Sequence, residues 1–153
     1  MKSRSVNLIC LLVFGLILAG TALPAFGSID DAITINNDGV DLYTRGFYTA
    51  SIDRFQAALT YDPNNAQIYT NMGFAYMASN MPEYALESFR KGLAITPGDL
   101  EVHNNLAICL YTMGQRDQAI GEWEFVLRTD PNYEQANALL VKARRAALSE
   151  ELP

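Results

Sequence analysis

The sequence predicts an all-α protein, a solenoid made of consecutive helix pairs. Two observations support this prediction. One group of residues recurs every 34 positions, and apolar residues inside each unit recur with the three- and four-residue spacing of a helix. The composition agrees, because 50% of the 153 residues are hydrophobic and 18% are charged, as in a packed domain.

Residues 1–27 are expected to be an export signal and are set apart from the fold. A basic start precedes an apolar run that begins at Leu8, and small residues at Ala25 and Gly27 suit cleavage by a signal peptidase. An uncleaved membrane anchor is the alternative, because the apolar stretch approaches the ~20 residues that cross a bilayer. The sequence therefore predicts an exported protein, periplasmic or secreted, with membrane contact only if this segment stays attached as an N-terminal anchor.

The charge and the scarcity of reactive side chains exclude several classes of function. The formal net charge is −6, and loss of Lys2 and Arg4 with the signal lowers it to −8, which disfavours nucleic acid as a partner. The chain has one histidine, and Cys109 is the only cysteine after cleavage. No phosphate-binding glycine loop, paired histidines or Cys-x-x-Cys motif occurs. We therefore expect no catalytic residues, no metal and no cofactor, and a buried Cys109, with pairing to another chain as the alternative.

The 34-residue period is read most easily from three prolines, Pro63, Pro97 and Pro131. A large aromatic residue precedes each proline by eight positions: Phe55, Phe89 and Trp123. Further upstream a small residue recurs in the same register: Gly39, Gly73 and Ala107. Three units in register predict three copies of one supersecondary structure.

Each unit is expected to contain two helices. A break falls at the same place in every unit, at Gly46, Asn80 and Gly114, which are residue types that tolerate a left-handed helix end. Pro82 then suits a helix start, and the three repeating prolines end the second helices. After a lead-in at 28–31, this predicts units at 32–65, 66–99 and 100–133. A capping helix follows at 134–149 and a tail at 150–153, since a solenoid must cover its last apolar face.

These positions resemble the tetratricopeptide repeat (TPR) family. The middle unit matches the family pattern best, at Tyr69, Met72, Gly73, Tyr76, Ala85, Phe89 and Pro97. The third unit departs at His103 and Ala107, and the first departs at Asp38, where no preceding unit needs an apolar contact. The resemblance implies a right-handed superhelix whose first helices line a concave groove.

Three rows of residues are expected to face that groove, on the side of the first helices opposite the small residues. The row of asparagines is Asn37, Asn71 and Asn105, and the next row is Val40, Phe74 and Ile108. The third row is Tyr43, Met77 and Tyr111. An asparagine amide matches the donor and acceptor of a peptide unit, and several TPR proteins hold an extended backbone in this way. The alternatives are local hydrogen bonds for the asparagines and packing between helices for the apolar rows.

The resemblance and the groove together predict a protein-binding adaptor or scaffold, with a role in assembling an envelope complex. The lysine and arginine places of the chaperone-binding TPR clamp hold Asn36, Glu101 and Asn105, so a ligand with a terminal carboxylate is disfavoured. Asp41, Asp99 and Glu101 favour a neutral or mildly basic segment. The alternative is a structural subunit or a homo-oligomer that associates through its convex face or its ends. An enzyme is disfavoured.

Overall fold

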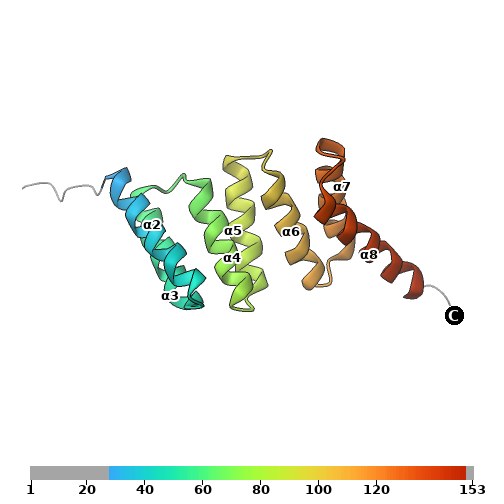
Figure 1. Cartoon of the computed structure of the whole chain (residues 1–153), viewed down its shortest axis with the longest axis horizontal. Coiled ribbons are helices and arrows are strands. Elements are labelled where there is room, and N and C mark those ends of the chain that lie inside the picture. The colour runs from blue at the N-terminus through green and yellow to red at the C-terminus, as the bar shows by residue number, and fades with distance from the viewer. Residues whose placement is uncertain (1–27, 151–153) are drawn as a thin grey trace, which may run out of the picture.

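The computed structural model describes residues 28–150 and consists there of seven helices without a strand, which confirms the all-α solenoid (Figure 1). The helices are α2 (Ile29–Thr44), α3 (Tyr48–Tyr61), α4 (Ala66–Ala78), α5 (Pro82–Ile95), α6 (Leu100–Thr112), α7 (Arg116–Thr129) and α8 (Glu134–Glu150). The expected export signal, residues 1–27, lies outside the described residues. Among the helices of the described part, none is both long and apolar enough to cross a membrane.

Neighbouring helices along the chain are also neighbours in space. They pack as the pairs α2–α3, α4–α5 and α6–α7, each second helix packs on the next first helix, and α8 packs on α7. Figure 1 shows the pairs following one another along the long axis, with α2 and α8 at opposite ends of the array. The first helices α2 and α4 also touch each other directly, which makes theirs the inner side of the array.

The first helix begins at Ile29, three residues before the expected start at 32. Ser28 explains the difference because it forms a capping box with Asp31. The Ser28 hydroxyl oxygen accepts from the Asp31 backbone N–H at 3.2 Å, and the Ser28 backbone N–H donates to the Asp31 carboxylate at 2.7 Å. Two N–H groups that a helix start leaves without partners are thereby satisfied.

The turns inside the pairs have the left-handed geometry that the sequence indicates. The φ angles are +82° at Gly46, +58° at Asn80 and +76° at Gly114. In each turn the next backbone N–H donates back across the helix end, as from Met81 to the Tyr76 carbonyl at 2.9 Å. This closes the first helix and directs the chain into the antiparallel second helix.

The recurring aromatic residues form the centre of each pair. Phe55, Phe89 and Trp123 are at most 1% exposed. The phenylalanine rings fit only because the facing residue is glycine. A Cβ added at Gly39 would lie 2.6 Å from the Phe55 ring, and one at Gly73 would lie 2.5 Å from the Phe89 ring.

Candidate functional site

The inner side of the solenoid carries a small cavity between α2 and α4. Its volume is about 210 Å3, and the side chains around it are Val40, Tyr43, Thr44, Phe55, Asn71 and Phe74. Val40 and Tyr43 share a face of α2 because they lie one turn apart. The structure thus brings together members of all three predicted rows, and the walls are mainly apolar.

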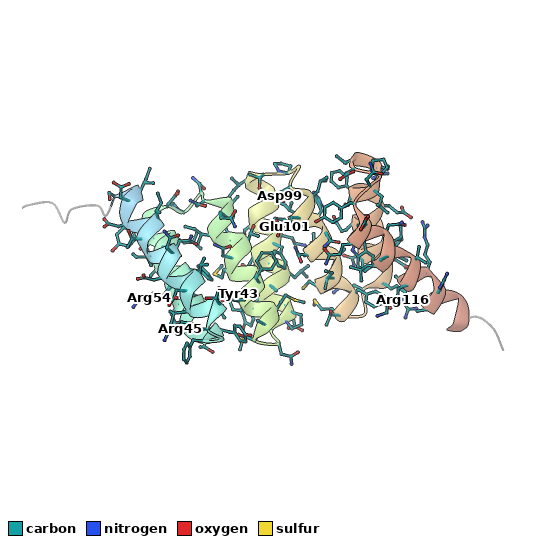
Figure 2. The ribbon with its side chains drawn as sticks, in the orientation of Figure 1. Tyr43, Arg45, Arg54, Asp99, Glu101 and Arg116 are labelled. Atoms are coloured by element: carbon teal, nitrogen blue, oxygen red, sulfur yellow. The ribbon has the colours of Figure 1, made fainter. Side chains whose placement is uncertain are left out.

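The aromatic walls of this cavity are held by rings beneath them. Phe74 meets the buried Phe89 edge to face, with ring centres 5.6 Å apart. Tyr43 packs against Tyr48 at the same centre-to-centre distance, and Figure 2 shows Tyr43 between α2 and α4. Such pairs stabilise the orientation of both rings, and the cavity between them is present without a ligand.

The three asparagines have three different environments. The Asn71 amide nitrogen donates to the Asn36 side-chain oxygen at 3.0 Å, and Gln67 donates to the Asn71 side-chain oxygen at 3.0 Å. Asn71 therefore ties α4 to α2, yet it retains one N–H and one lone pair for a ligand. The Asn105 amide donates to the Glu101 carbonyl at 2.7 Å, as the local alternative predicts, and Asn37 is exposed.

The remaining predicted groove residues lie outside this cavity. Met77, Ile108 and Tyr111 are partly buried and pack against the large hydrophobic core cluster. The Tyr111 ring centre is 5.8 Å from that of Trp123. Ile108 and Tyr111 of the third unit and Met77 of the second therefore pack between helices, while the cavity is formed by the first two units.

The beginning of α6 gives the solenoid an acidic region. Asp99 caps this helix by accepting from the backbone N–H groups of Glu101 and Val102, both at 3.1 Å, and the Glu101 side chain is exposed. Figure 2 shows Asp99 and Glu101 together at this end of the helix. Burial raises the pKa of the nearby Tyr133 hydroxyl, and the negative charges of Glu101 and Asp99 raise it further. The same charges would repel an anionic ligand.

Four side chains of types that enzymes use in catalysis have partners or are buried within the fold: His103, Glu122, Glu124 and Cys109. His103 lies between the Glu122 carboxylate, at 2.7 Å, and the Pro97 carbonyl oxygen, at 3.0 Å. The Glu124 carboxylate pairs with Arg144 at 2.6 Å. Cys109 is fully buried, and burial raises the pKa of its thiol to about 11. Within residues 28–150, no group of three or more His, Cys, Asp or Glu side chains is placed to hold a metal ion.

Two residues of the cavity, Thr44 and Phe55, were not predicted from the sequence. Thr44 follows Tyr43 directly and ends α2, so its position beside the groove rows was a usable signal. Phe55 was identified only as a recurring aromatic position of the repeat. Its ring reaches the cavity because Gly39, which faces it, has no side chain.

A second cavity, of about 250 Å3, lies among α3, α4 and α5 and was not predicted from the sequence. Tyr69, Tyr76 and Tyr84 contribute to its walls. Their spacing of seven and eight residues was visible in the sequence, but Tyr69 and Tyr76 are also positions of the repeat pattern, which accounts for them without a cavity.

Two family models match this chain. A TPR repeat model matches residues 39–80, and a tetratricopeptide repeat model matches residues 77–143. Among curated proteins, the peroxisomal targeting signal receptor of Saccharomyces cerevisiae is 28% identical over 83 residues, which are 54% of this chain and 14% of the receptor. The photosystem I assembly protein Ycf3 of Synechococcus elongatus is 25% identical over 128 residues, 82% of this chain and 72% of that protein.

Solved structures share the fold at low sequence identity. The first TPR of Spaghetti (RPAP3), bound to the HSP90 peptide SRMEEVD, aligns with a TM-score of 0.75 and 21% identity over 78% of this chain and 94% of that one. The Yersinia enterocolitica type III secretion chaperone SycD, in complex with a peptide of the translocator YopD, aligns with a TM-score of 0.72 and 16% identity over 77% and 95%. With its three in-register helix pairs and its capping helix, the chain belongs to the tetratricopeptide repeat family.

Proposed function

We propose that this protein is an exported adaptor that holds an extended segment of a partner protein against α2 and α4. The observation that carries the proposal is the apolar cavity between these helices, which has the Asn71 amide in its wall. An apolar side chain of the partner enters the cavity, and the amide pairs with the adjoining peptide unit. Because the walls are fixed by packing, little ordering entropy is lost on the side of this protein.

The relatives support protein binding as the mode of action. The RPAP3 domain and SycD were each solved with a bound peptide, and Ycf3 is named for the assembly of photosystem I. A role as an assembly factor for an envelope complex agrees with these neighbours and with the export signal expected at residues 1–27.

The preferred ligand is a neutral or mildly basic segment. Glu101 and Asp99 stand at the beginning of α6, so an anionic segment would meet repulsion there, whereas the charge of Asp41 on α2 is balanced by Arg45 at 3.0 Å. Asn36 and Asn105 stand where the chaperone-binding clamp has cations, which gives a terminal carboxylate no counter-charge.

The proposal is tested by paired valine substitutions in the mature chain, residues 28–153. Val40 is 38% exposed in the cavity wall, and Val141 is 42% exposed on α8, outside it. We expect Val40→Asp to abolish capture of the partner from an envelope extract and Val141→Asp to preserve it, with unchanged circular dichroism for both. Equal capture by the two variants would show that the cavity is not part of the binding interface.

A second substitution tests the amides. Replacing Asn37, Asn71 and Asn105 together by alanine should weaken binding of the captured partner through loss of the Asn71 contact. If Asn105→Ala alone accounts for the whole effect, the assignment to Asn71 is wrong.

Association through the end of the solenoid is a second candidate, favoured by two exposed side chains at the start of α2. Ile29 is 65% exposed and Ile33 is 49% exposed, on the first helix of the described residues. Light scattering across a range of protein concentrations tests this candidate. A constant monomer mass rules out the homo-oligomer.

A further inference from the structure

The second cavity lies on the opposite face of α4 from the groove. α4 contributes Tyr69 and Tyr76 to it but contributes Asn71 and Phe74 to the first cavity. Residues two positions apart on a helix point in nearly opposite directions, since each residue turns the helix by about 100°. The second cavity therefore opens between α3 and α5 and is separate from the proposed groove.

The walls of this cavity combine stacked aromatic rings with hydrogen-bond donors. The rings of Tyr76 and Tyr84 are stacked, with centres 5.3 Å apart and planes 26° from parallel. The Gln56 amide donates to the Tyr76 hydroxyl oxygen at 3.1 Å, which leaves the hydroxyl proton of Tyr76 available to a ligand. The Tyr84 side chain is accessible, since the residue is 58% exposed.

The charges at the rim exclude charged ligands. The Lys91 ammonium lies 2.6 Å from the Glu87 carboxylate and 5.9 Å from the centre of the Tyr69 ring. The hydrogen bond to Glu87 raises the pKa of Lys91, so the lysine stays protonated and the pair is neutral as a whole. A ligand cation would meet the ammonium beside the ring, and a ligand anion would meet Glu87. The ligand class that fits these walls is therefore neutral, with hydrogen-bond acceptors for the donors described above.

A polyproline II segment has these properties and the right repeat length. Its carbonyl groups are free acceptors, its proline residues have no N–H to satisfy, and proline rings pack on aromatic faces. Tyr69 and Tyr76 are seven residues apart on α4, a rise of about 10.5 Å. Prolines three residues apart in polyproline II are separated by about 9.3 Å, so each can meet one of the two tyrosines.

We propose that the cleft between α3 and α5 is a second binding site, which takes a neutral Pro-x-x-Pro segment of a partner protein. Tyr69 receives one proline, and the Tyr76–Tyr84 stack receives the other. Gln56, the tyrosine hydroxyls and Lys91 donate to the carbonyl groups of the segment. The site goes beyond the proposed groove function and does not depend on it.

The test uses the mature chain and a fluorescein-labelled peptide with two Pro-x-x-Pro motifs and no charged residues, followed by fluorescence anisotropy. Tyr84→Ala is the test variant because the exposed ring can be removed without opening the core. Tyr61→Ala is the matched control, since Tyr61 is 40% exposed on α3 but does not line the cleft. Val40→Asp shows whether the peptide binds in the groove between α2 and α4 instead.

We expect saturable binding that Tyr84→Ala weakens by about tenfold, in line with the loss of one aromatic platform. Tyr61→Ala and Val40→Asp should bind as the unchanged chain does. Four outcomes would overturn the proposal: no saturable binding up to millimolar peptide, equal binding by Tyr84→Ala, loss of binding in Val40→Asp alone, or equal binding of a peptide whose prolines are replaced by alanine. The groove function is untouched by any of them except the third, in which the peptide would be a groove ligand.

Discussion

Alanine at Gly73 should destabilise the protein although alanine is the better helix former. Gly73 is buried inside α4, and its Cα faces the ring of Phe89. A Cβ there would lie 2.5 Å from the nearest ring carbon, whereas carbon atoms in contact lie about 3.5–4.0 Å apart. The ring or the helix must therefore retreat by about 1 Å.

The magnitude follows from two opposing effects. Phe89 is fully buried and is held by its edge-to-face contact with Phe74, so the ring cannot move without disturbing the core. Overpacking of this kind costs about 1–3 kcal/mol, and we take the upper end because the obstacle is a fixed ring. The higher helix propensity of alanine offsets about 1 kcal/mol of this cost. The expected net loss is about 2 kcal/mol in the free energy of unfolding.

Urea unfolding followed by circular dichroism measures this loss, and the chain offers a matched control. Gly121 is exposed to solvent in the middle of α7, and a Cβ added there would have no atom within 4 Å. Gly121→Ala should therefore stabilise the protein by up to about 1 kcal/mol. In a Phe89→Leu background the cost of Gly73→Ala should shrink by about 1 kcal/mol or more, because the ring is gone. The reasoning is refuted if Gly73→Ala stabilises as Gly121→Ala does, or if its cost is the same in both backgrounds.

Three further predictions concern stability and use the same unfolding assay. Asn80→Ala should cost about 1 kcal/mol, because φ is +58° there, while Asn80→Gly should be neutral; equal effects would contradict the left-handed turn. Ser28→Ala should cost about 1 kcal/mol through loss of the capping box, and Ser28→Asp should retain most of the stability; an alanine variant as stable as the parent would show that the cap is dispensable. The pKa of Cys109 is raised from 9.0 to about 11, so between pH 9 and 11 the unfolded thiol ionises before the folded one, and stability should fall by up to about 1.4 kcal/mol per pH unit. A Cys109→Ala chain should lack this part of the decline, and identical pH profiles would show that the thiol does not contribute.

The sequence was sufficient for the repeat architecture because the fold is encoded locally. Every unit carries its own aromatic centre and turn, as at Phe89 and Asn80, so the period of 34 reveals the pairs directly. The binding surface could not be read in the same way, because it depends on contacts between units. The bridge from Asn71 to Asn36 and the cavity that α4 forms with α2 are set by how α2 sits on α4, which no pattern within one unit specifies.

The buried core is divided, and this has a consequence for how the ends of the molecule behave. One hydrophobic cluster is made of residues from α3 and α4. A second is made of residues from α5, α6, α7 and α8, and Tyr76 packs against both clusters. Because each helix touches mainly its neighbours in sequence, detachment of the first pair breaks the cluster that α3 shares with α4 but leaves the cluster of α5 to α8 intact, as expected for a one-dimensional array. The groove cavity lies between α2, in the first pair, and α4, in the second pair, and so at the contact that breaks when the first pair detaches. A segment bound there would stabilise the contact between the first pair and α4. It should therefore slow hydrogen exchange in α2 and α3 far more than in α7. Occupancy of the groove could then be measured as protection of the α2–α3 end against hydrogen exchange.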